Sequence, residues 1–185
     1  MRVLVACEFS GVVRRAFRDE GHEAFSCDLL EADDDQAHHI RGDALLIATA
    51  SRWDMIVAFP PCTHVAVSGA RWFKFKRQEQ AEALLFMRRI MELPIRRIAM
   101  ENPVGVFSTH YRKPDQIIQP WQFGHGETKA TCLWLKGLPL LEPTEIVPGR
   151  EPRVHRESPG PDRWKRRSLT YEGIAKAMAT QWGEE

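Results

Sequence analysis

The chain has 185 residues, with 26 Lys and Arg against 25 Asp and Glu, so its formal net charge at pH 7 is +1. This length predicts one domain, residues 1–185, and the near-neutral charge excludes a protein whose whole surface attracts a polyanion. No apolar run at the N-terminus has the pattern of a signal peptide or a membrane span, which favours a cytoplasmic protein without a membrane partner.

The cysteines and histidines give no metal or disulfide pattern. The four cysteines form no Cys-x-x-Cys pair, which fits a reducing compartment and argues against a disulfide framework and a zinc site. His38 and His39 lack a nearby thiol or third ligand, so we interpret them as a solvated loop and expect no metal. Basic residues gather at 150–167, where they either contact phosphate or form ordinary solvated surface.

The first part of the chain alternates strand and helix patterns. Residues 3–7 form an apolar run typical of a buried strand, and the spacing of Val13, Ala16 and Phe17 predicts a helix that ends at Gly21. Residues 24–27 then predict a second strand, closed by Asp28. Strand, helix and strand in this order indicate a βαβ opening.

The middle of the chain continues this alternation. Residues 44–50 form a short helix or an irregular turn, residues 55–59 a strand, and residues 97–100 another strand closed by Glu101. Between these strands, an amphipathic helix is marked by Ala83, Phe86, Met87 and Ile90, and Pro94 ends it.

The pattern changes after Pro103. Residues 116–119 and 131–135 are strand-like and predict an antiparallel hairpin at the edge of the sheet. Prolines break residues 138–167 into an irregular segment, and residues 168–185 predict a C-terminal helix. The expected fold class is therefore α/β, with a doubly wound, mostly parallel, Rossmann-like sheet.

Cys62 is the strongest candidate for a reactive group. It follows Pro60 and Pro61 directly after the 55–59 strand, and the prolines hold the backbone extended, so the thiol is presented on a stiff loop. Open α/β sheets bind ligands where their strands end. The alternative is that Cys62 is one more small, buried apolar residue.

The other strand ends add polar groups to the same edge. Asp28, Cys62 and Glu101 face one crevice if their strands are parallel, and Asp28 holds the position that usually accepts from a ribose hydroxyl. The turn at residues 8–11 is where the polar end of a cofactor packs against helix-terminal amides. Asp43 either accepts from an adenine amino group or belongs to a simple turn.

These residues together resemble the cytosine-5 DNA methyltransferases, which use S-adenosyl-L-methionine and a cysteine nucleophile. The resemblance spans about residues 1–137, preserves the order of the family's motifs, and is greatest with short phage and prophage versions. The matching motifs are Phe9-Ser10-Gly11, Asp28, Gly42-Asp43, Pro61-Cys62 running to Ser68-Gly69, Glu101-Asn102, and Phe123-Gly124 leading through Glu127 and Lys129 to Thr131.

The chain departs from the family pattern at several positions. Thr63 replaces a Gln, Pro103 a Val, and Lys129 and Thr131 replace two arginines. The final Gly-Asn-x-x-Pro element is not visible, and residues 168–171 stand in its place. No room remains after Leu138 for a target-recognition domain, so sequence recognition is either weak or supplied by a protein partner.

The resemblance implies a role for each matched residue. Cys62 adds to the pyrimidine ring, Glu101 holds its exocyclic amine and Lys129 supplies a positive charge. The cofactor residues are Phe9, Ser10, Gly11, Asp28, Asp43 and Pro60, and the substrate residues are Thr63, Ser68, Asn102, Arg71 and Trp72. The last two belong to a run of cations and aromatics at 71–77, which is typical of single-strand or flipped-base binders or else begins the amphipathic helix.

The expected substrate is cytosine in double- or single-stranded DNA. Two alternatives stay open: methylation of a free pyrimidine nucleotide, and a non-catalytic protein that binds DNA or cofactor with a degenerate methyltransferase fold. An amino-methyltransferase is disfavoured, because such enzymes need an aromatic residue after the two prolines and Cys62 occupies that position.

Overall fold

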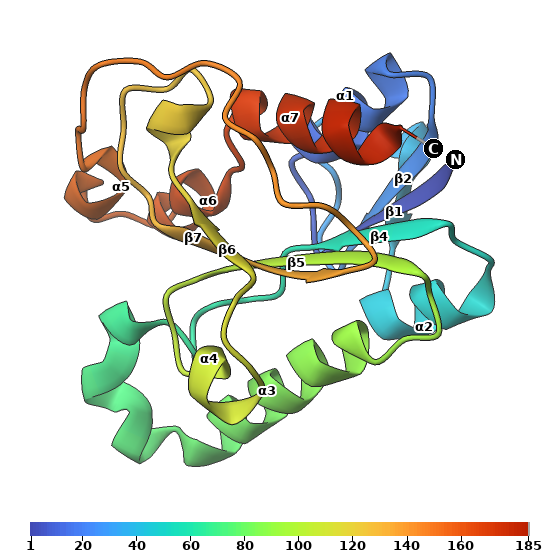
Figure 1. Cartoon of the computed structure of the whole chain (residues 1–185). Coiled ribbons are helices and arrows are strands. Elements are labelled where there is room, and N and C mark those ends of the chain that lie inside the picture. The colour runs from blue at the N-terminus through green and yellow to red at the C-terminus, as the bar shows by residue number, and fades with distance from the viewer. Residues whose placement is uncertain (185) are drawn as a thin grey trace.

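A seven-stranded sheet with the order β3-β2-β1-β4-β5-β7-β6 forms the centre of the computed structural model, which describes residues 1–184 (Figure 1). The strands are β1 (Arg2–Ala6), β2 (Glu23–Asp28), β3 (His39–Arg41), β4 (Met55–Ala58), β5 (Arg97–Pro103), β6 (Gln116–Ile118) and β7 (Thr131–Lys136). The first five strands pair in parallel, and β7 is antiparallel to both β5 and β6. The predicted doubly wound α/β class is confirmed.

The predicted antiparallel pair at the edge of the sheet is confirmed. Strand β7 is its inner strand, between β5 and β6, and β6 is outermost. Residues 131–135 of β7 are all buried, whereas Ile117 of β6 is 53% exposed. A strand with two buried faces belongs inside a sheet, which explains the position of β7.

Helices cover both faces of the sheet (Figure 1). Helices α1 (Val12–Asp19) and α7 (Glu172–Gly183) pack on one face, and α2 (Ala44–Ala50), α3 (Arg77–Met91) and the short α4 (Phe107–His110) pack on the other. Two apolar clusters result, one on each side. Because the strands β1, β2, β4 and β5 are parallel, their carboxyl ends share one edge, where ligand sites form in such sheets.

Several boundaries differ from the sequence-based expectations. Strand β5 continues through Glu101 to Pro103, because its last residues pair with β7. The C-terminal helix begins at Glu172 rather than at residue 168, and the segment before it contains two short helices, α5 (Arg153–Arg156) and α6 (Arg163–Ser168). Three 3₁₀ helices complete the chain: η1 (Gln36–His38), η2 (Val67–Phe75) and η3 (Pro120–Gln122). Within residues 1–184, no helix is long and apolar enough to span a membrane.

Candidate active site

The loop after β4 presents Cys62 at the surface. The Cys62 carbonyl accepts hydrogen bonds from the amides of Val65 and Ala66, at 3.1 and 2.9 Å, so the chain turns back immediately after the cysteine. Val65 is fully buried and anchors the turn, whereas Cys62 itself is exposed. The interpretation of Cys62 as a buried apolar residue therefore does not hold, although Cys27 and Cys132 are buried in that way.

The segment at the end of β5 fixes this loop in place. The Asn102 side chain donates to the Pro60 carbonyl at 2.7 Å, and the Val106 amide donates to the Val65 carbonyl at 2.9 Å. A Cβ at Gly105 would collide with the Val65 carbonyl, so only glycine allows this approach. The loop is thus held by backbone and side-chain contacts on the side of β5.

Asn102 has a different place from the one we expected. It is only 1% exposed, and its amide nitrogen is committed to Pro60, so it cannot contact a substrate while the loop keeps this position. Its Oδ1 atom is buried without a hydrogen-bond partner. Asn102 is a positioning residue for the Cys62 loop.

Glu101 and Lys129 lie close enough to Cys62 to influence its charge. Although Cys62 is exposed, the surrounding protein removes part of the water around its thiol. This desolvation and the Glu101 carboxylate raise the pKa of the thiol, while the positive charges of Lys129 and Arg167 oppose this. Burial also raises the pKa of Glu101, against the opposing effects of Lys129 and Thr131. Met100 pairs with Ala58, so Glu101 lies at the strand end where the Cys62 loop begins. The roles of Cys62, Glu101 and Lys129 in catalysis stay predictions, and Arg167 is a further charge that acts on Cys62.

Lys129 connects the site to the C-terminal part of the chain. Its ammonium donates to the Leu169 carbonyl at 3.3 Å and lies 5.9 Å from the centre of the Tyr171 ring. The nearby Glu127 accepts from Arg153 Nε at 2.8 Å and from the Tyr171 hydroxyl at 2.5 Å. Glu127 therefore ties residues 153 and 171 to the sheet. Arg167 and Tyr171 were missed as site residues, although Arg167 belongs to the basic segment noted at 150–167.

The turn after β1 is closed by its own side chains. The Glu8 carboxylate accepts from the amides of Val13 and Arg14, at 2.6 and 3.2 Å, and the Ser10 hydroxyl donates to Glu8 at 3.4 Å. Gly11 has a φ of 71°, and the Asp34 carboxylate lies over it. Glu8 therefore already pairs with the amides of Val13 and Arg14, so these two amides are not free for a cofactor. Cofactor binding by Phe9, Ser10 and Gly11 stays a prediction.

The predicted acceptors for the cofactor lie at neighbouring strand ends. One oxygen of Asp28 accepts from the Leu30 amide and one oxygen of Asp43 accepts from the Leu46 amide, each at 2.9 Å, so that Asp43 caps α2. Ala6 of β1 pairs with Cys27 of β2, so Cys7 and Asp28 follow at the same edge of the sheet. Burial raises the pKa of the Cys7 thiol, and the negative charges of Asp28 and Asp43 add to this effect. Cys7 has a φ of 59°, a backbone conformation that often marks functional sites in non-glycine residues.

This arrangement fits S-adenosyl-L-methionine. The ribose hydroxyls and the adenine amino group are hydrogen-bond donors, and carboxylates at the ends of β2 and before α2 can accept from them. Phe9 is a buried aromatic residue on the same turn, and Pro60 is buried beside the Cys62 loop.

Apart from Asn102, the predicted substrate residues are exposed. Thr63 and Ser68 lie at the surface of the Cys62 loop. Arg71 lies 5.2 Å from the Trp72 ring centre, and Trp72 is 52% exposed. The residues from 67 to 75 form η2 rather than the beginning of α3, so the cations and aromatics of this run face solvent.

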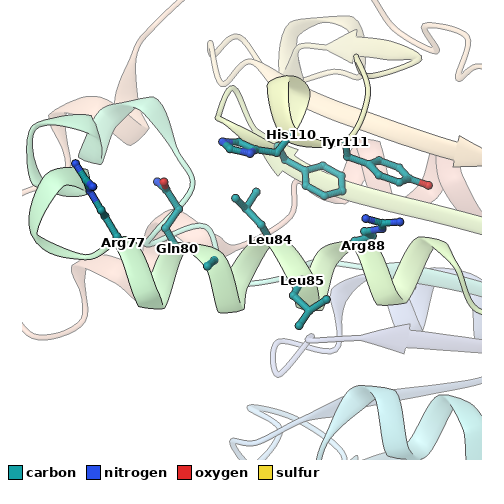
Figure 2. A pocket seen from close by; sticks show the side chains of 9 residues that line it. Arg77, Gln80, Leu84, Leu85, Arg88, His110 and Tyr111 are labelled. Atoms are coloured by element: carbon teal, nitrogen blue, oxygen red, sulfur yellow. The ribbon is translucent and has the colours of Figure 1, made fainter.

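A shallow groove lies outside this site. It has a volume of about 390 Å³ and runs between α3 and the end of α4 (Figure 2). Figure 2 shows Leu84 and Arg88 of α3 near His110 and Tyr111. None of the predicted site residues lines it.

The interpretation of His38 and His39 as a solvated loop is wrong, because His38 ends η1 and His39 begins β3. His38 bonds to Asp35 at 2.8 Å, whereas His39 bonds to Ser26 and to the Leu30 carbonyl, each at 2.9 Å. In residues 1–184, no group of three or more His, Cys, Asp or Glu side chains is arranged to hold a metal ion.

Comparison with known proteins relates this geometry to methyltransferases. No protein-family model and no curated protein matches the chain. A solved structure of an E. coli prophage protein, assigned as a DNA modification methyltransferase, aligns with a TM-score of 0.53 at 15% identity, covering 86% of this chain and 55% of that one. The chain has a methyltransferase fold.

Two further solved structures support the same fold. The Entamoeba histolytica methyltransferase EhMeth aligns with a TM-score of 0.52 at 12% identity, covering 86% of this chain and 60% of its own. The S. pombe Dnmt2 methyltransferase aligns with a TM-score of 0.53 at 13% identity, covering 84% of this chain and 54% of its own. This chain therefore spans between half and two thirds of the length of the proteins that it resembles.

Proposed function

We propose that this protein transfers a methyl group from S-adenosyl-L-methionine to the 5-position of cytosine in DNA, through a covalent adduct with Cys62. The observation that carries this proposal is the exposed Cys62 on a loop that Asn102 holds through its hydrogen bond to Pro60. The charges of Glu101 and Lys129 both act on the pKa of this thiol, which supports their proposed roles. The fold, shared with structures of methyltransferases, supports the same reaction class.

Covalent addition is required because the 5-position of cytosine is too electron-poor to attack a methyl sulfonium directly. When the Cys62 thiolate adds to C6, the electron pair of the C5–C6 double bond is delocalised over C5, C4 and N3, which makes C5 nucleophilic. Bound S-adenosyl-L-methionine would supply the electrophilic methyl group and leave as the neutral thioether. Transfer of the C5 proton to solvent then re-forms the double bond and expels the Cys62 thiolate.

Glu101 and Lys129 have complementary roles in this scheme. Because burial raises the pKa of Glu101, the carboxyl retains a proton to higher pH and can donate it to the ring N3 while accepting from the exocyclic amine. The Lys129 charge lowers the pKa of Cys62 relative to burial alone and so increases the thiolate fraction. Both groups favour addition of the thiolate to the ring.

DNA is the preferred substrate because of the exposed surface of η2. Lys74 lies 4.7 Å from the centre of the Phe75 ring, and Phe75 is 68% exposed, so η2 offers a second cation and aromatic pair beside that of Trp72. Bases stack on exposed aromatics, and cations hold the backbone, in proteins that bind single strands or flipped bases.

A free pyrimidine nucleotide is the second candidate substrate. The net charge of +1 favours it, since this charge gives little general attraction for a long polyanion. Both candidates use the same residues and the same chemistry.

The test is methyl transfer from labelled S-adenosyl-L-methionine to DNA and, in parallel, to cytidine and uridine monophosphates. We expect label in DNA and its loss in Cys62→Ser, which keeps the size of the side chain but not the thiolate. Label in nucleotide alone would replace DNA with the second candidate. Cofactor or DNA binding without methyl transfer would instead indicate a non-catalytic binding protein.

A further inference from the structure

Helix α6 links the cofactor turn to the substrate side of the candidate site. The Trp164 ring centre lies 5.7 Å from that of Phe9, and the Lys165 ammonium lies 2.5 Å from the Asp33 carboxylate. Just after the helix, the Leu169 carbonyl accepts from Lys129. Figure 1 shows α5 and α6 at the upper left of the molecule and η2, coloured teal-green, at the lower left. The basic C-terminal segment thus closes one side of the site.

Arg167 of α6 has a hydrogen-bond donor that is left unpaired by the rest of the described chain. Its Nε atom is buried and has no hydrogen-bond partner within the described residues 1–184. The other two arginines of the helix are paired, since Arg166 contacts the Glu157 carboxylate at 2.7 Å and Arg163 donates to the Glu157 carbonyl at 2.8 Å. Buried polar groups are normally paired, so an unpaired guanidinium N–H suggests a missing acceptor.

Arg167 lies on the side of the candidate site formed by Lys129 and the end of α6. It is two residues from Leu169, whose carbonyl accepts from Lys129 at 3.3 Å. The positive charges of Lys129 and Arg167 both oppose the rise in the pKa of the Cys62 thiol. A guanidinium offers several donors in a rigid plane, which suits carbonyl and phosphate oxygens.

We propose that Arg167 donates to an acceptor oxygen of the target pyrimidine nucleotide, either the ring carbonyl O2 or an oxygen of its phosphate. The proposal rests on the proposed function, from which it takes a pyrimidine nucleotide as the substrate. At O2, the guanidinium stabilises the negative charge that spreads over the ring when the Cys62 thiolate adds to C6. At the phosphate, it holds the nucleotide in register with the thiol.

The first experiment measures the charge near Cys62 without any methyl transfer. Alkylation of Cys62 by anionic iodoacetate and by neutral iodoacetamide is followed by peptide mass spectrometry in the wild type, Arg167→Ala and Arg166→Ala. Loss of a nearby cation slows the anionic reagent more, so we expect Arg167→Ala to lower the ratio of the two rates by about fivefold. Arg166→Ala, which removes the same charge one residue away, should change it less than twofold. Equal ratios in the two variants would overturn the placement of Arg167.

The second experiment measures contact with the nucleotide. A short cytosine-containing oligonucleotide should protect Cys62 from iodoacetamide, and Arg167→Ala should raise the concentration for half-protection by about tenfold, with partial recovery in Arg167→Lys. The dependence of binding on salt identifies the acceptor. If Arg167→Ala reduces the slope of log affinity against log salt concentration by about 1, the acceptor is the phosphate, and if the slope is unchanged, it is O2. Absence of protection in the wild type, or equal protection in Arg167→Ala, would overturn the proposal. Failure of methyl transfer with protection intact would refute only the proposed catalysis.

Discussion

Glu8 should make the stability of the protein depend on pH in a measurable way. Its carboxylate is 5% exposed, and burial raises its pKa from 4.5 to about 7, although the α1 amides and the charges of Arg14 and Arg15 oppose this. The folded protein therefore holds this proton up to about pH 7, whereas the unfolded chain releases it near 4.5. The contribution of Glu8 to the free energy of unfolding falls as the pH rises through this window, by about 3 kcal/mol in total.

The perturbation that isolates this effect is Glu8→Gln, which keeps an acceptor for the Val13 amide but cannot ionise. Urea unfolding of the wild type and the variant at pH values from 5 to 8 gives the difference in free energy at each pH. We expect this difference to shift in favour of Glu8→Gln by about 3 kcal/mol across the range. Glu79→Gln, on the exposed first turn of α3, is the control. A constant difference between wild type and Glu8→Gln would refute the reasoning.

Three further predictions concern the Cys62 loop. Asn102→Ala leaves the buried Pro60 carbonyl unpaired, so the free energy of unfolding should fall by about 1–3 kcal/mol and methyl transfer by at least about tenfold; unchanged urea unfolding would contradict the role of this contact. Glu101→Gln removes a negative charge that raises the pKa of Cys62, so alkylation of Cys62 by iodoacetamide at pH 9 should become faster. Methyl transfer should fall about 100-fold, because the proton donor to the ring is lost. Slower alkylation would contradict the effect of Glu101 on the Cys62 thiol. Gly105→Ala should displace the loop and reduce methyl transfer, whereas Gly160→Ala, where a Cβ meets nothing within 4 Å, should leave it unchanged; equal effects would show that the Gly105 approach is unimportant.

The sequence was sufficient for six of the seven strands, for the longer helices and for the place of the thiol after β4, but not for the short strand β3. Apolar runs such as 55–58 identify buried strands, and the two prolines before Cys62 indicate an extended loop at a strand end. These features are local, so short stretches of sequence contain the necessary information.

The remaining features depend on contacts between distant residues. The place of β7 inside the sheet follows from its pairing with β5, which local periodicity does not specify. The proposed role of Arg167 depends on contacts of α6 with residues far away in the sequence, Phe9 and Asp33. Asn102 matched a motif whose function suggested substrate contact, but its burial and its bond to Pro60 give it a positioning role.

The covalent step tests the central claim most directly. DNA in which 5-fluorocytosine replaces cytosine cannot lose a proton from C5, so a methylated adduct cannot release the enzyme. With S-adenosyl-L-methionine present, we predict a protein–DNA complex that survives denaturing electrophoresis, carries its link on the peptide containing Cys62, and is absent in Cys62→Ser. Methyl transfer to ordinary cytosine in DNA without any such complex, or a link on another cysteine, would contradict the account.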